Sequence, residues 1–197
     1  MYHVGSRVLQ DRFDSRRIAD RLEEVTAHDV LNEHDTAFIE AADLFFLATA
    51  DVDGWPDVSH KGGLPGFVRV LDPTTLAFPS YDGNGQFRSL GNLLVNPRVG
   101  LLFIDFDQPN RLRIQGVAQV RDEPELVAQW EGAQLVVTVA PERIFPNCPR
   151  YIHRRALVER SPYAPRPDYE PPVPEWKRME VFRDALPDPP PGARPDS

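Results

Sequence analysis

Cysteine is almost missing from this sequence, because Cys148 is the single cysteine among 197 residues. One cysteine excludes a disulfide within the chain and a metal site built from several thiolates. His28 and His34 are six residues apart, which matches no common ligand spacing, so we expect no metal site. The sequence also contains no Gly-X-Ser-X-Gly motif, so nothing in it indicates a hydrolase.

Long apolar runs and clustered cations are lacking as well. No segment approaches the roughly 20 apolar residues of a membrane-spanning helix, and the polar residues 1–20 do not resemble a secretory signal. The net charge of −8 argues against a protein that binds a nucleic-acid backbone. We therefore expect a cytoplasmic protein with neither a membrane nor a nucleic acid as its partner.

Short strands dominate the pattern that is present. Apolar runs and period-two alternation predict six or seven strands, and apolar residues at helical spacing predict helices. The expected strands are 44–49, 56–61, 67–71, 74–79, 99–106, 112–121 and 135–144; the expected helices are 14–28, 33–42, 87–94 and 123–130. Hairpin-linked strands with one helix after the fourth favour a closed or split antiparallel barrel, since the βα alternation of a parallel sheet is absent.

The chain also divides by composition. We expect residues 1–42 to form a helical segment that packs on the barrel and residues 43–160 to form the barrel itself. Residues 161–197 are rich in proline, and we expect them to wrap the barrel as an extension with a disordered end from Pro187 onward.

One candidate site lies between residues 80 and 97, where a glycine-rich loop opens a helix that carries Arg88, Ser89 and Asn92. The N-terminus of a helix offers unpaired N–H groups, and an arginine adds a bidentate fork, so the segment suits a phosphate monoester. Arg88 and Asn92 are four residues apart and share one helix face. The alternative is a surface helix with an exposed arginine.

A second candidate site is the stretch Ser59 to Gly63. Alternation along a strand puts the Ser59 hydroxyl and the Lys61 ammonium on one face and His60 on the other. Both could hold the same phosphate, and the glycines, beginning with Gly62, would let a planar ring approach the backbone. The alternative is a hairpin end with solvated side chains. Lysine is scarce in this chain, which has Lys61 and Lys177 among its 22 basic residues.

Several motifs in this order resemble the pyridoxamine 5′-phosphate oxidase-like family. The motifs are FLATAD at 46–51, GWPDVS at 54–59, KGG at 61–63, GFV at 66–68, TLAFP at 75–79, Arg88-Ser89, and NPRVGLLF at 96–103. The segment 146–152, PNCPRYI, is similar to a signature of an uncharacterised branch of that family. The resemblance implies a mainly β fold, an FMN-binding split antiparallel β-barrel with Greek-key connections, and a homodimer. In a single split barrel we expect the apolar strand face of Leu101 and Phe103 to lie uncovered, and pairing of two copies would cover it.

The resemblance also implies a set of FMN-binding residues. Arg88 and Lys61 stand where relatives grip the phosphate, and Val58, Ser59, Pro79 and Ser80 stand where they line the ribityl chain and the ring. Ser89 replaces a second phosphate-binding lysine, for which Asn92 would compensate. Arg111 stands where true oxidases have a flavin-contacting glutamine, and it would reach the flavin of the other subunit.

The implied activity is that of an FMN-dependent oxidoreductase with an unknown substrate. True pyridoxamine-phosphate oxidases share a C-terminal Arg-Leu-X-Pro segment that helps to clamp the substrate, and this chain has Trp176-Lys177-Arg178 instead, so the oxidase activity itself does not transfer. Two alternatives remain: a non-catalytic protein that binds or stores flavin or haem, with His60 or His153 as a haem ligand, and a relative that uses a deazaflavin.

Overall fold

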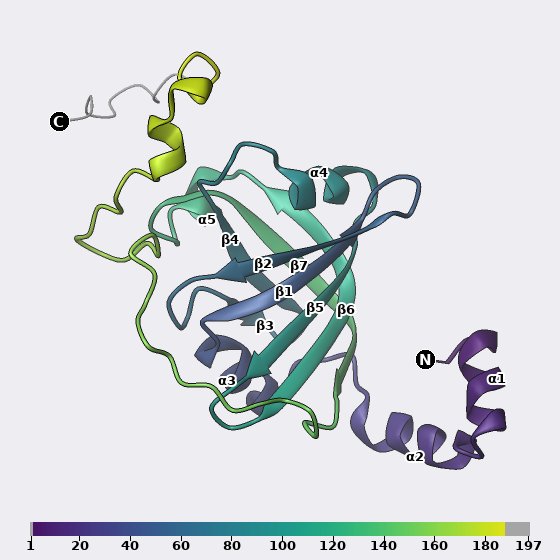
Figure 1. Ribbon diagram of the computed structural model, residues 1–197. Helices are drawn as coiled ribbons and strands as arrows, with labels where there is room; N and C mark the ends of the chain where they lie inside the picture. The colour runs from purple at the N-terminus through teal and green to yellow at the C-terminus, as the bar shows by residue number, and fades with distance from the viewer. Residues whose placement is uncertain (1, 188–197) are drawn as a thin grey trace.

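The computed structural model describes residues 2–187 and is built around one seven-stranded sheet (Figure 1). The strands are β1 (Leu44–Ala50), β2 (Pro56–Gly62), β3 (Arg69–Asp72), β4 (Thr75–Tyr81), β5 (Arg98–Asp105), β6 (Asn110–Arg121) and β7 (Ala133–Pro146). The helices are α1 (Val4–Arg12), α2 (Arg16–Thr26), α3 (Glu33–Ala41), α4 (Arg88–Val95) and α5 (Pro124–Val127), followed by the 3₁₀ turns η1 (Glu175–Arg178) and η2 (Glu180–Phe182). None of the described helices is both long and apolar enough to cross a membrane.

The strands pair in the order β2-β1-β5-β6-β7-β4-β3, and each pairing is antiparallel. Strands β5, β6 and β7 follow one another as a meander. Strand β4 reaches β5 through α4 yet pairs with β7, which closes a Greek key. The sheet curls into a split barrel, so the predicted mainly β, split antiparallel architecture is confirmed.

Aromatic rings fill the centre of the barrel. Phe45 on β1 lies against Phe103 on β5 and Phe78 on β4, with ring centroids 5.0 Å and 4.9 Å away, and all three side chains are fully buried. Strand β1 alternates between buried and half-buried residues, so its odd-numbered side chains face this core. Each such ring removed from water contributes roughly 1.5–3 kcal/mol.

One expectation about this core was wrong. We expected the apolar side chains of Leu101 and Phe103 to lie on an uncovered face of the barrel, but both are buried in the core. The half-buried face of β5 carries Leu102 and Ile104 instead. The inward face of β5 was assigned wrongly because its apolar residues are consecutive. Such a run does not show which alternate side chains point into the core.

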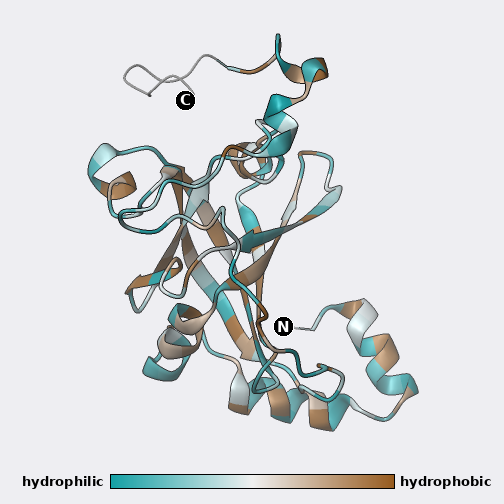
Figure 2. Ribbon diagram, turned by 60° about the vertical axis from the view of Figure 1, so that its left-hand side comes forward, coloured by the Kyte–Doolittle hydropathy of each residue, from teal (hydrophilic) through white to brown (hydrophobic). Residues whose placement is uncertain are grey.

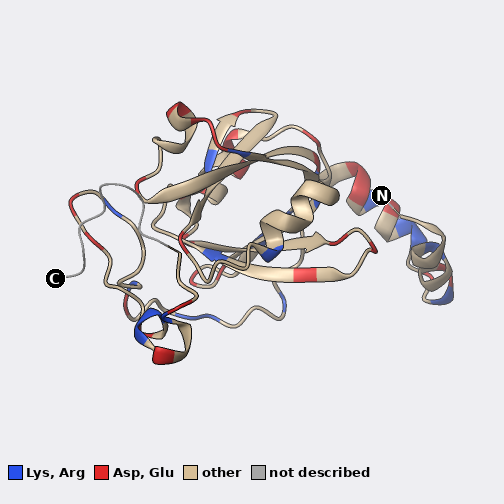
Figure 3. Cartoon of the chain, turned by 90° about the horizontal axis from the view of Figure 1, so that it is seen from above, with Lys and Arg blue, Asp and Glu red and all other residues tan. Residues whose placement is uncertain are grey.

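Helices α1 and α2 form an arm, and none of the residues in these two helices is buried (Figures 1 and 2). Their large apolar side chains are 50–81% exposed: Val4, Val8, Leu9, Phe13, Ile18, Leu22 and Val25. Charged residues of both signs cover the rest of the arm (Figure 3). The sequence did not indicate α1. The second helix begins later than expected because Asp14, predicted as part of it, has a left-handed backbone (φ 48°).

Helix α3, in contrast, is tied to the sheet. A capping box fixes its start, since the Asn32 side chain accepts from the Asp35 N–H and Asp35 accepts from the Asn32 N–H. Glu40 then accepts the N–H of Gly66 with its carbonyl and the N–H of Val70 on β3 with its carboxylate. Of the N-terminal helices, α3 is the one that packs on the barrel.

After β7 the chain runs along the outside of the barrel without further strands until η1 (Figure 1). Prolines break any helical or strand period here, as the composition predicts. Disorder was predicted from Pro187 onward, and residues 188–197 of that end lie outside the described residues. The division at residues 42 and 160 stays a prediction.

Candidate functional site

A cleft of about 1300 Å³ opens at the end of the barrel that carries α4. Its walls come from β2, the end of β4, the loop 82–87, the start of α4 and the C-terminal turns. Six of the ten predicted site residues line it: Val58, Ser59, Lys61, Ser80, Arg88 and Ser89. The fold therefore brings together residues up to 31 positions apart in the sequence.

The start of α4 presents hydrogen-bond donors to this cleft. Phe87, the N-cap residue, has a left-handed backbone (φ 47°) and makes no side-chain cap. Among the described residues, the N–H groups of Arg88, Ser89 and Leu90 have no acceptor, and the first helical bond runs from Gly91 to Phe87. Unpaired N–H groups together with the helix dipole favour an anion at this position.

Packing fixes the direction of α4. Leu90 and Leu93 are buried against the barrel. The Asn92 amide donates to the hydroxyl of Thr49 on β1 at 3.0 Å. Asn92 thus does not line the cleft; it anchors the helix whose N-terminus does.

Strand β2 contributes a cation to the same cleft. Its less exposed face carries Asp57, Ser59 and Lys61, while His60 points the other way, with its ring 6.1 Å from that of Phe46. Burial lowers the pKa of Lys61, and the nearby Asp57 carboxylate raises it by a smaller amount. Neither Lys61 nor Arg88 has an ion-pair partner among the described residues, so both cations are available to a ligand.

The end of β4 adds the hydroxyl of Tyr81, which was not among the predicted site residues. Pro79 is buried and keeps the strand next to β7, and Ser80 and Tyr81 follow it into the cleft wall. Burial raises the pKa of Tyr81, while Arg69 opposes the rise. The Tyr81 phenol is therefore neutral near pH 7 and can donate a hydrogen bond.

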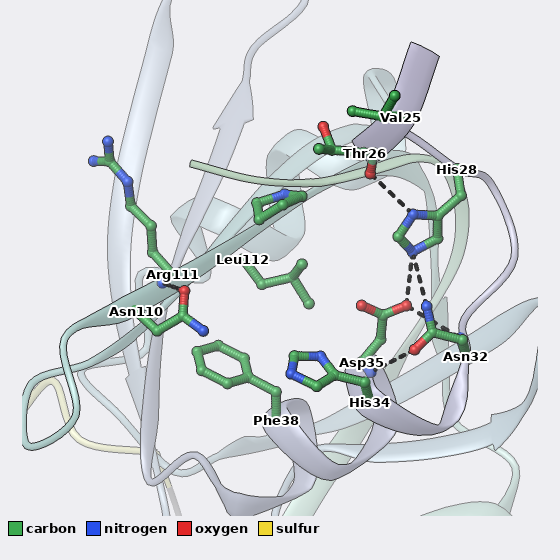
Figure 4. Close-up of a pocket in the computed structure, with 11 residues that line it drawn as sticks. Val25, Thr26, His28, Asn32, His34, Asp35, Phe38, Asn110, Arg111 and Leu112 are labelled. Atoms are coloured by element: carbon green, nitrogen blue, oxygen red, sulfur yellow. Dashed lines mark hydrogen bonds and ion pairs between the residues drawn. The ribbon is translucent and has the colours of Figure 1, made fainter. Parts of the chain in front are cut away.

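Arg111 lies apart from the cleft. It lines a second cavity of about 340 Å³ between α3, β6 and the end of α2. Figure 4 shows its guanidinium at the rim, pointing away from the pair formed by His28 and Asp35, whose atoms Nε2 and Oδ2 are 2.7 Å apart. The Arg111 Nε is buried without a partner. Within one chain, Arg111 does not join the other predicted residues.

Gly62 does not line the cleft either, although it ends the strand that does. The predicted site residues did not include Trp176, Lys177 and Phe182, which come from η1 and η2 and line the cleft opposite the barrel. One signal was available, since Lys61 and Lys177 are the two lysines of the chain and both reach this cleft. Across the described residues, no three His, Cys, Asp or Glu side chains gather into a metal site.

The fold is an antiparallel split barrel, and the start of α4, with its unpaired N–H groups, lines the cleft. The family model for pyridoxamine 5′-phosphate oxidase matches residues 31–162, about two thirds of the chain. The chain therefore belongs to this family.

Solved structures with the same fold were also found. A Lactobacillus delbrueckii protein named after pyridoxamine 5′-phosphate oxidase is 25% identical, with a TM-score of 0.50 over 61% of this chain and 99% of its own. HupZ of Group A Streptococcus is 22% identical (TM-score 0.49; 64% and 99% covered). HutZ of Vibrio cholerae, a haem storage protein, is 22% identical (TM-score 0.43; 58% and 93% covered). No curated protein matches the chain.

Proposed function

We propose that this protein binds FMN in the cleft beside α4 and acts as an FMN-dependent oxidoreductase. One observation carries the proposal: Lys61 and Arg88, which have no ion-pair partner among the described residues, line the same cleft as the free N–H groups at the start of α4. This donor set fits a phosphate monoester, which needs several donors and a compensating charge. The chain has no Gly-X-Gly-X-X-Gly fingerprint for a dinucleotide, which favours FMN over FAD.

The rest of the cleft fits the remainder of FMN. The volume of about 1300 Å³ exceeds the roughly 300–1000 Å³ of a typical small-ligand site, so a flavin leaves room for a substrate. Ser59 and Ser80 offer hydroxyls that suit a ribityl chain, and Val58 and Tyr81 offer surfaces for a ring. We retain Gly62 and Pro79 as backbone neighbours of the ligand and Asn92 as a positioning residue.

Bound FMN would supply the redox chemistry, accepting and donating electrons at its ring. The side chains of this chain would bind and orient it. Arg88 and the α4 N–H groups would neutralise the phosphate, and Lys61 would hold its other edge. The neutral Tyr81 phenol would donate a hydrogen bond to a ligand oxygen. No side chain needs to act as a general base for a flavin to react, so the site requires none.

The test is the absorption spectrum of the purified protein. We expect a yellow protein that releases FMN, and not FAD, on denaturation. Turnover with oxygen or a reduced nicotinamide then separates an oxidoreductase from a storage protein, and a deazaflavin cosubstrate can be tested in the same assay. Colourless protein that fails to bind added FMN would contradict the proposal.

A haem protein would instead show a Soret band. Among the residues that line the cleft there is no histidine, cysteine or methionine, and His60 lies on the opposite face of β2. His153 lies on the exposed segment after β7. These positions favour flavin over haem as the ligand of the cleft.

The affinity for FMN should fall as the pH rises through the pKa of Lys61. The pKa of Lys61 in the free protein lies below its usual value near 10.5 because of burial, and a bound phosphate would raise it. Binding is then strongest below the free pKa, where Lys61 is charged, and weakens as the pH rises through it. Titrations at several pH values should show this loss for FMN but not for riboflavin, and Lys61→Ala should abolish it. An unchanged profile in that variant would argue against a phosphate contact.

We also propose that the protein is a homodimer with a site at each subunit interface. The arm α1–α2 exposes seven large apolar side chains, and the half-buried face of β5 adds Leu102 and Ile104. An isologous contact would cover such surfaces in both subunits. It would also let Arg111 reach the flavin of the partner. Light scattering should give twice the mass of one chain, and a stable flavin-loaded monomer would refute the proposal.

A further inference from the structure

The outer wall of the cleft is a separate piece of chain. Residues 175–186, here called the cap, comprise η1, η2 and the residues that follow them. Trp176, Lys177, Phe182 and Leu186 of the cap line the cleft, and the cap lies at the α4 end of the barrel (Figure 1). The cap is more than 90 residues away in sequence from the loop that it faces.

Side chains within the cap contact one another. The rings of Trp176 and Phe182 meet edge to face at a centroid distance of 5.9 Å. The Lys177 Nζ lies 5.7 Å from the Trp176 ring centroid. Two aromatic side chains and one cation of the cap therefore pack against one another.

One ion pair joins the cap to the barrel side of the cleft. The Lys177 ammonium donates to Oδ2 of Asp82, the first residue of the loop that leads into α4. The Lys177 side chain is 25% exposed and that of Asp82 55%. Both residues line the cleft, as Arg88 does, and the pair is made by the chain alone.

We propose that the cap is a gate over the cofactor cleft and that the Lys177–Asp82 ion pair holds it closed. This proposal rests on the proposed function, because the gated molecule is FMN. The pair forms without a contribution from the ligand, so it restricts entry and release alike. Lys177 and Asp82 are therefore positioning residues that set the exchange rates and leave the affinity unchanged.

Stopped-flow binding of FMN to the full chain tests the gate. For a partly exposed ion pair, Lys177→Ala or Asp82→Asn should raise both the association and the dissociation rate about two- to fivefold, equivalent to about 0.4–1 kcal/mol. The dissociation constant should stay the same within about twofold, since the two rates change together. The charge swap Lys177→Asp with Asp82→Lys should restore slow exchange. Arg178→Ala, which removes the exposed neighbouring cation, is the matched control and should exchange FMN at the wild-type rates.

Tryptophan fluorescence supplies a second measurement. Trp176 is one of three tryptophans in the chain; Trp55 is exposed and Trp130 is buried against the barrel. If the cap covers the flavin, FMN should quench the wild type strongly and Trp176→Phe much less. Melting temperatures check that each variant is folded.

The outcomes separate the two proposals. Wild-type protein that does not bind FMN contradicts the proposed function and the gate with it. Wild-type protein that binds FMN while the Lys177 and Asp82 variants keep wild-type rates contradicts the gate alone. A weaker affinity with an unchanged association rate would make Lys177 a direct ligand contact and also overturns the gate.

Discussion

Replacing Arg88 with alanine should weaken FMN binding by about 10- to 150-fold, because charge-assisted hydrogen bonds to a phosphate contribute roughly 1.5–3 kcal/mol. Arg88 stands at the first position of α4, lines the cleft and has no ion-pair partner among the described residues. Its removal leaves the helix N-terminus and Lys61 in place, so binding should weaken without being abolished. Equilibrium titration monitored by flavin fluorescence measures the change.

Riboflavin gives the control within the same experiment. It carries the ring and the ribityl chain but no phosphate, so its affinity should hardly change in Arg88→Ala. Arg98→Ala removes an exposed arginine that does not line the cleft and should leave both affinities unchanged. Equal losses for FMN and riboflavin would mean that Arg88 supports the fold, and no loss for either would make it a solvated surface charge.

Replacing Gly116 with alanine should reduce the free energy of unfolding by about 1–3 kcal/mol or more. Gly116 is buried on β6, where the register with β7 shifts. A Cβ at this position would lie 2.3 Å from the carbonyl oxygen of Ala140 and 3.1 Å from the Cα of Pro141. Both contacts are with backbone, so the two strands would have to separate. Urea denaturation measures the loss.

Gly100→Ala is the matched control on the neighbouring strand β5. Its Cβ would meet the Cβ of Ala48 at 3.6 Å, an ordinary van der Waals distance. We expect the free energy of unfolding to change by less than about 1 kcal/mol. It can increase, because alanine restricts the unfolded chain more than glycine does. If both variants unfold at the same urea concentration, the close approach of β6 and β7 at Gly116 is not a real constraint.

The order of the elements could be predicted from local patterns. Alternation placed Ser59 and Lys61 on one face of β2, and the apolar spacing of residues 87–94 placed a helix where α4 lies. Both follow from periods that a few neighbouring residues define. The family resemblance implied ten FMN-binding residues, and six of these line one cleft.

Other features depend on contacts between distant segments. Gly116 looks like any strand glycine until β7 is packed against it, and Asn92 looks like a phosphate ligand until Thr49 is found beside its amide. The prediction of which β5 side chains point into the core was wrong, because a run of consecutive apolar residues is compatible with either face pointing inward. No short-range pattern contains this information.

The sequence alone determined the order of the strands, the alternation along β2 and the cation-bearing segments, because these depend on residues one to four positions apart. The tertiary structure decided what surrounds the cleft. It brought Tyr81 and the cap to the same cavity as Lys61 and Arg88, and it left Arg111 at another one. The cap could not be predicted because a proline-rich segment has no period, and its place is set by the Lys177–Asp82 ion pair, which joins residues 95 positions apart.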